Sequence, residues 1–180
     1  MNALLGNIWL TIQTQLATIT DLKFIDLDTG QLEYKDSQER PAVLLPCALF
    51  DFVKSDYTDL SLNVQEGDLL LEVRIGVNPF TQATQYFTDT QKENALNFFN
   101  IEQEVYVALQ GWATQYFGPM SRVSLTTERR NDKLRVRIMR FKFTYVDLTA
   151  TQVTTQIGRP PFQLNTTDQG SGVGSGYTGS

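Results

Sequence analysis

The chain has 180 residues, with 41% hydrophobic and 19% charged residues and a net charge of −5. This length suits one compact domain plus a tail. No apolar run approaches the roughly 18 residues that span a bilayer, so we expect no membrane segment. The first residues, MNALLGNIWL, lack the basic region and cleavage site of a secretory signal, so we expect the protein to stay in the compartment where it is made.

Histidine is absent, and Cys47 is the only cysteine. Histidine is the usual general base near neutral pH and the commonest metal ligand. Sites built from several thiolates are excluded as well. We therefore expect no metal and no cofactor, and we predict that the protein is not an enzyme. Cys47 lies in the apolar run 42–50 and is interpreted as a buried small hydrophobe.

The first predicted elements are a helix over residues 3–19 and a short strand over residues 22–27. Asp28-Thr29-Gly30 then supplies a turn toward Leu32, which we expect at the surface. The apolar run 41–50 is strand-like, but Pro46 cannot donate to a ladder, which predicts an edge or bulged strand. The helical prediction rests on apolar residues at three- and four-residue spacing: Leu5, Ile8, Ile12, Leu16 and Ile19.

The clearest strand signal is an antiparallel hairpin. Residues 60–64 and 69–77 each alternate apolar and polar side chains, and Gln65-Glu-Gly-Asp between them supplies the turn. One face of the second strand should be buried. The other face, with Glu72 and Arg74, should meet water or a partner.

A second helix is predicted to begin at Asn100, with Asn100 and Gln103 forming a capping box. Two more strands follow. In the last one, apolar side chains occupy even positions up to Ile138 and odd positions from Met139 to Tyr145, which predicts a β-bulge at Ile138-Met139.

These elements predict the α+β class, with an antiparallel β-sheet that carries the N-terminal helix and the second helix on one face. The domain should comprise residues 1–147. Residues 148–180 are rich in Gly, Ser and Thr and are predicted to form an extended C-terminal arm.

Two features are candidate contacts. Residues 129–142 carry a charge of +6, which favours a subunit contact or a channel lumen; the alternatives are a solvated sheet face and proximity to DNA without base-specific binding. The long loop 78–91 carries aromatic side chains that either pack in the core or anchor a neighbouring subunit. The candidate residues are Arg129, Arg130, Lys133, Arg135, Arg137, Arg140 and Lys142 in the basic stretch, and Phe80, Tyr86 and Phe87 in the loop.

The order of elements, the segment Val105-Tyr-Val-Ala-Leu-Gln-Gly-Trp, and Phe117-Gly, Arg122, Asp132 and Phe143 after it resemble the tail terminator and tail-completion (head-tail joining) proteins of tailed bacteriophages. The resemblance covers roughly residues 1–147. It implies a non-catalytic virion protein that forms a hexameric ring at the neck. Its implied partners are the tail tube protein and the head connector or portal-side ring.

The same resemblance implies assembly in the host cytoplasm and a final place in the virion tail or neck. Two alternatives remain open at this stage. One is another head-tail adaptor or a baseplate subunit, which would share the ring but bind another partner. The other is a small cytosolic ligand-binding domain, which would have a deep pocket with convergent polar groups.

Overall fold

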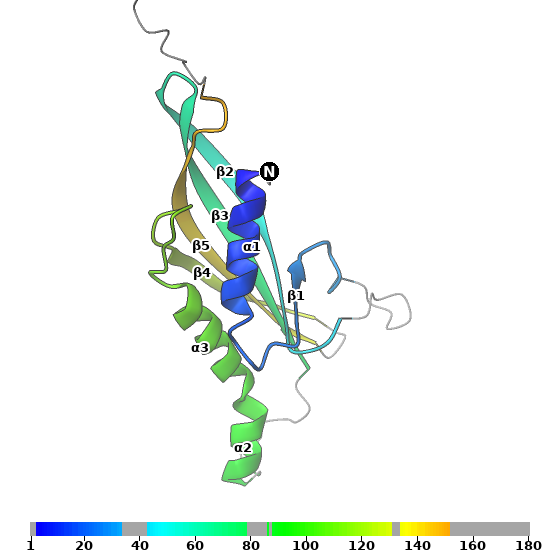
Figure 1. Cartoon of the computed structure of the whole chain (residues 1–180). Helices are drawn as coiled ribbons and strands as arrows, with labels where there is room; N and C mark the ends of the chain where they lie inside the picture. Colours follow the sequence, from blue (N-terminus) through cyan, green and yellow to red (C-terminus); the bar gives the residue numbers. More distant parts are fainter. Residues whose placement is uncertain (1–2, 34–42, 79–85, 87, 131–133, 152–180) are drawn as a thin grey trace, which may run out of the picture.

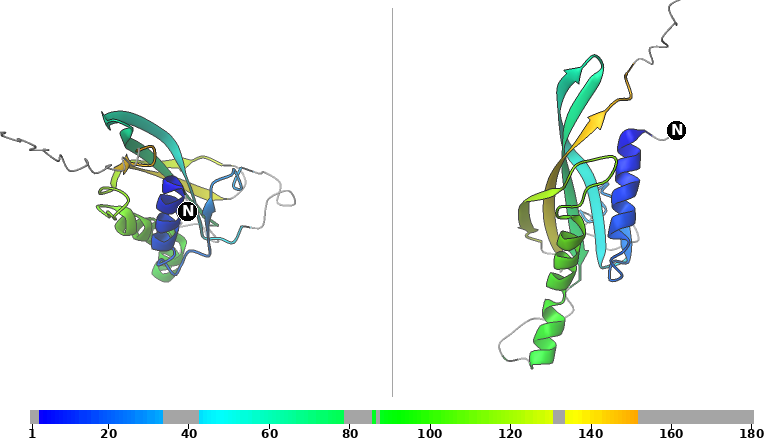
Figure 2. Two further views of the ribbon diagram at one scale, coloured as in Figure 1. Left: turned by 45° about the horizontal axis from the view of Figure 1, so that its top comes forward. Right: turned by 60° about the vertical axis from the view of Figure 1, so that its left-hand side comes forward.

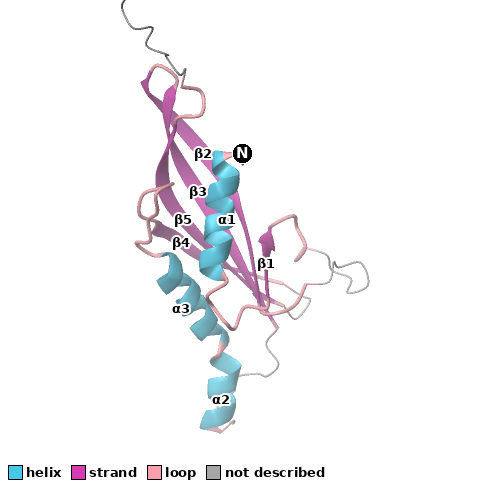
Figure 3. Ribbon diagram, viewed as in Figure 1, coloured by secondary structure: helices cyan, strands magenta, loops and turns pink. Residues whose placement is uncertain are grey.

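The computed structural model describes residues 3–33, 43–78, 86, 88–130 and 134–151 of the chain, which form one sheet and three helices (Figures 1 and 3). Residues 152–180 of the predicted C-terminal arm (148–180), and part of the long loop, lie outside the described residues. In chain order the elements are α1 (Leu4–Leu16), β1 (Phe24–Leu27), β2 (Cys47–Ser61), β3 (Val64–Val77), α2 (Asp89–Leu96), α3 (Phe98–Leu109), β4 (Ser121–Glu128) and β5 (Arg135–Asp147).

The sheet has five strands in the order β1-β2-β3-β5-β4, and the fold is α+β. The sheet is mixed, because β1 runs parallel to β2 while every other pairing is antiparallel. The segment after β1 therefore does not return as a hairpin. It forms a turn at Gly30, whose φ is 84°. Leu32, which we expected at the surface, is fully buried after this turn.

Helices α1 and α3 pack on the same face of the sheet, which we call the helix face, and the main core lies between them and the strands (Figure 1). The predicted stripe of α1 is confirmed. Its central members are buried, and Trp9 beside them stacks on Phe50 of β2 with ring centroids 4.9 Å apart. The buried helical residues are Ile8, Ile12 and Leu16 of α1 and Ile101, Val105 and Leu109 of α3.

The opposite face, which we call the open face, holds a second, smaller apolar cluster beside the start of β2. It buries Leu32, Cys47, Leu49 and Val136, with Ile138 packed against them. Cys47 is thus a buried thiol, as expected.

This second cluster explains why the apolar positions of β5 change parity. The pairing of β5 with β3 continues without a shift through Arg74↔Ile138 and Val73↔Met139, so the predicted bulge is wrong. Val136 and Ile138 face the small cluster, whereas Met139 and the odd residues after it face the main core. Near its start, β5 buries even-numbered side chains on the open face, and farther along it buries odd-numbered side chains on the helix face. Its apolar residues therefore do not keep to one alternation along the whole strand.

The hairpin between β2 and β3 is confirmed, but its turn lies at Leu62-Asn63, ahead of the predicted position. Asn63 has a φ of 61°, a conformation that asparagine tolerates better than most residues. Gly67, which suggested a turn, lies inside β3. A Cβ atom there would meet the Tyr145 ring at 2.3 Å, so the glycine provides room for that ring.

Three further boundaries differ from the predictions. Pro46 precedes β2, which is an inner strand along Cys47–Phe50, where it lies between β1 and β3. The last part of the predicted loop belongs to α2, which begins at Asp89. Helix α3 begins at Phe98, so Asn100 is inside the helix, where its side chain bonds Asn97, and it forms no capping box.

The distal half of the β2–β3 hairpin extends beyond the part of the sheet that α1 and α3 cover (Figures 1 and 2). We call Val53–Glu66 the arm. None of its residues is buried. It is held at its base by Tyr57, which stacks edge-on against Tyr145 and shares a hydroxyl hydrogen bond with it.

Candidate functional site

The basic residues predicted as contacts on β5 are divided between the two faces of the sheet. Arg135 and Arg137 are odd-numbered, like the β5 residues that face the main core, so they lie on the helix face. The even-numbered Arg140 and Lys142 lie on the open face. The stretch is therefore not a single basic surface.

On the helix face, Glu102 of α3 lies between two arginines and pairs with both. Its carboxylate accepts a hydrogen bond from Arg137 Nε at 3.1 Å and lies 3.7 Å from Arg135 Nε. The Arg135 guanidinium also stacks over the Phe98 ring, 3.9 Å from its centroid. Burial raises the pKa of Glu102 above its ordinary value of 4.5, because desolvation of the carboxylate outweighs the attraction of Arg137 and Arg135.

On the open face, β5 pairs its cations with acids of β3. Arg140 binds Glu72 at 2.7 Å, and Lys142 lies 3.0 Å from Asp68. Glu72 and Arg140 are directly opposite in the register, so this is a cross-strand ion pair. These contacts connect β5 to β3. They also pair Arg140 and Lys142 within the chain, so that these cations are less available to a partner.

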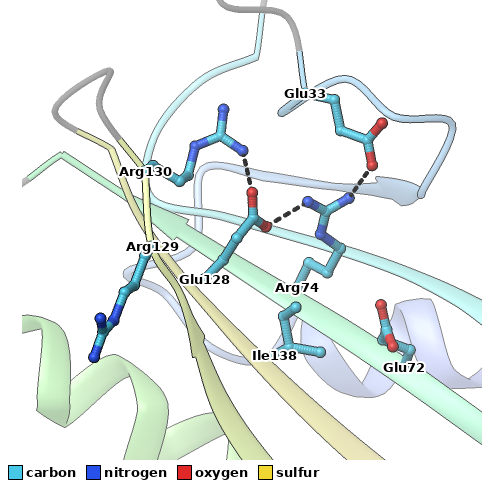
Figure 4. Close-up of a pocket in the computed structure, with 7 residues that line it drawn as sticks. All are labelled: Glu33, Glu72, Arg74, Glu128, Arg129, Arg130 and Ile138. Atoms are coloured by element: carbon cyan, nitrogen blue, oxygen red, sulfur yellow. Dashed lines mark hydrogen bonds and ion pairs between the residues drawn. The ribbon is translucent and has the colours of Figure 1, made fainter.

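Arg74 of β3 is the centre of a larger ionic cluster on the open face (Figure 4). We expected it to meet water or a partner, but its side chain is only 8% exposed. It lies 3.3 Å from Asp28, 3.1 Å from Glu33 and 2.7 Å from Glu128. The cluster thereby connects the turn after β1 to β3 and β4.

Arg130 extends this cluster. Its guanidinium binds Glu128 at 2.6 Å and donates a hydrogen bond to the Leu32 carbonyl oxygen. Burial by itself would raise the pKa of Glu128, but the hydrogen bonds and charges of Arg74 and Arg130 outweigh it and hold that pKa below its ordinary value of 4.5. Glu128 is therefore a carboxylate that the fold stabilises in its charged form.

A depression of about 760 Å³ lies over this cluster (Figure 4). Its carboxylates already bind arginines of the same chain, which satisfies most of the charge that a ligand could meet. Arg129 is exposed there, and among the described residues we find no ion-pair partner for it. The depression is lined by Glu33, Glu72, Arg74, Glu128, Arg129, Arg130 and Ile138.

The other predicted contacts fall mostly outside the described residues. Lys133, Phe80 and Phe87 are not among them. Tyr86 is, and its side chain is exposed. The structure therefore does not test whether the loop aromatics form an anchor.

The arm exposes four large apolar side chains. Leu62 at its tip is 91% exposed, and Val53, Tyr57 and Leu60 are each about half exposed. The sequence analysis predicted the hairpin from the alternation at Leu60 and Leu62 but did not identify these residues as a contact surface. Exposed apolar side chains gathered on one projection mark a contact surface.

Comparisons with protein families and with curated proteins find no match for this chain. The described residues contain no group of three or more His, Cys, Asp or Glu side chains placed to hold a metal ion. Among the helices that the structure describes, none is long and apolar enough to cross a membrane.

Proposed function

We propose that this protein is a non-catalytic structural subunit that works in a homo-oligomeric ring. The observation that carries the proposal is the arm. An arm that projects from the fold and exposes Val53, Tyr57, Leu60 and Leu62 gains stability when a partner covers it. A solitary protein would carry it at a cost in solubility.

We further propose that the ring belongs to the neck of a tailed bacteriophage, as a tail terminator or connector layer. The sequence resemblance described above supports this placement, together with an α+β fold in which two helices cover one face of the sheet. The partners would be the tail tube protein on one side and the head connector or portal-side ring on the other. Another head-tail adaptor or a baseplate subunit would use the same surfaces with a different partner.

The ion pairs of β5 change how the basic stretch enters this proposal. Arg135, Arg137, Arg140 and Lys142 all pair with carboxylates of the same chain, which we interpret as contacts within the subunit. Arg129 keeps its charge exposed and is the described basic residue best placed to face another ring or passing DNA. The arm, and not the basic strand, is therefore the proposed contact surface.

The test is light scattering of the full chain at micromolar concentration, with Leu60→Ser/Leu62→Ser as the arm variant. Leu10→Ser/Val107→Ser is the matched control, because Leu10 on α1 and Val107 on α3 are exposed apolar residues away from the arm. We expect the unmodified chain and the control to form the same closed oligomer and the arm variant to dissociate. A monomeric unmodified chain would refute the proposal.

A further inference from the structure

Each of the two lateral edges of the sheet has a strand edge that no described strand covers. On one side, β1 pairs only with Cys47–Phe50, so β2 from Asp51 to Ser61 has a free outer edge. On the other side, β4 is the last strand and pairs only with β5. A free edge is a row of backbone donors and acceptors that can pair with another strand.

At each of these edges, the residues that the β-bulges leave unpaired are apolar. Register shifts leave Val53 and Leu60 unpaired on β2 and Val123 unpaired on β4. All three side chains are about half exposed. Proteins protect free edges with β-bulges and with lysine or other charges, and the β2 edge has both. The bulged positions themselves, however, hold exposed apolar side chains, which favours a partner that covers them.

We propose that the β2 edge of one copy pairs with the β4 edge of the next copy, so that the sheet continues from subunit to subunit. This inference rests on the proposed homo-oligomer and names its interface. Within the sheet, β2 and β4 run in opposite directions. Rotation about an axis along the strands preserves strand direction, so the junction is antiparallel, the commoner arrangement.

Charge favours this pairing over self-pairing of like edges. The free part of β2 has a net charge of −2, so two copies of it would repel each other. The β4 edge with its flanking Arg129 has a net charge of +1. Joining different edges is a head-to-tail contact, which closes into a ring when the rotation allows. The charged residues are Asp51, Lys54, Asp56 and Asp59 on β2, and Arg122, Glu128 and Arg129 on β4.

The register of the strands supplies the offset that ring closure needs. Ser124 at the middle of β4 lies level with Asp51, whereas the middle of the free β2 edge is at Asp56. Counted along β3, this offset is about four residues, or roughly 14 Å. One repeat from β2 to the β2 of the next copy crosses four interstrand spacings, the junction included, which is roughly 19 Å. The resulting strand tilt is about 35°, at the lower end of the range found in closed barrels.

The experiment uses full-length variants that block one edge each. Val53→Lys/Leu60→Lys blocks β2, and Val123→Lys/Leu125→Lys blocks β4. Leu10→Lys/Val107→Lys is the control, with the same substitutions on exposed helical positions. We expect each edge variant to be a monomer of 20.4 kDa and their equimolar mixture to form a heterodimer, since one intact edge of each kind remains. The control should assemble like the unmodified chain.

The outcomes separate this inference from the proposed function. If both edge variants assemble like the unmodified chain, the edge pairing is wrong while the homo-oligomer stands. If only the β2 variant is monomeric and the mixture forms no heterodimer, the contact is a self-pairing of β2 and the inference fails. A monomeric unmodified chain refutes both.

Backbone hydrogen exchange provides a second readout, which holds even if a lysine variant fails to fold. In the unmodified assembly, amides of residues 54–59 should exchange more slowly after assembly than in the dilute monomer. Equal exchange in the two states would overturn the edge pairing.

Discussion

Replacing Arg74 by Met should be one of the most destabilising single changes in this chain. The Arg74 side chain is 8% exposed and binds three carboxylates. Its loss leaves Asp28 partly buried without its described ion-pair partner and leaves Glu128 with Arg130 alone, while Glu33 can turn to water. Removing one partner from a buried ion pair costs about 3–5 kcal/mol, and partial solvation here suggests about 3. In urea, that corresponds to a midpoint lowered by about 1–2 M.

Urea unfolding followed by circular dichroism, at neutral pH and matched protein concentration, measures this change. Lys142→Met is the control, because Lys142 pairs with Asp68 on the same sheet, away from its free edges, but its side chain is 54% exposed. That variant should lose no more than about 1 kcal/mol. If Arg74→Met costs as little as Lys142→Met, the ionic cluster does not hold β1, β3 and β4 together and the reasoning fails.

Four further predictions concern pH and packing. Glu128→Gln should destabilise the protein at neutral pH and lose its effect as the pH falls below about 4.5, because the lowered pKa contributes stability only above the unfolded value. Glu102→Gln should show the opposite trend and gain stability relative to the unmodified chain as the pH rises from about 4 to 7, because the pKa of Glu102 is raised. Gly67→Ala should cost about 1–3 kcal/mol by collision with Tyr145. Gly6→Ala in α1, where a Cβ meets nothing, should stabilise by up to about 1 kcal/mol.

Urea midpoints measured across the pH range check the two carboxyl variants. Parallel pH profiles for Glu102→Gln and Glu128→Gln would contradict the opposite directions of their pKa shifts. Thermal melting compares the glycine variants. A Gly67→Ala protein as stable as the Gly6→Ala protein would show that the Tyr145 ring moves away without cost.

The parts of the fold that depend on local periodicity could be predicted from the sequence. The stripe of α1 and the alternation of β3 each identify one buried face, and the structure confirms both. The parity change in β5 has the same local signal as a bulge. Its actual cause is Leu32, a residue about a hundred positions earlier that covers Val136 from the open face. No local pattern could reveal that contact.

The candidate site was harder to predict for a similar reason. A run of basic residues is visible in the sequence, but its partners Glu72 and Glu102 come from another strand and a helix. Arg74 alternates with apolar residues, which suggests exposure, but contacts with the turn after β1 and with Glu128 of β4 bury it. Gly67 has the composition of a turn residue, although its role is set by Tyr145 across the sheet.

Native mass spectrometry of the full-length chain, combined with electron microscopy of the same sample, tests the central claim most directly. The account predicts a single closed oligomer with one copy number and a ring-shaped outline. A monomer at micromolar concentration, or an open series of sizes without closure, would contradict a ring subunit.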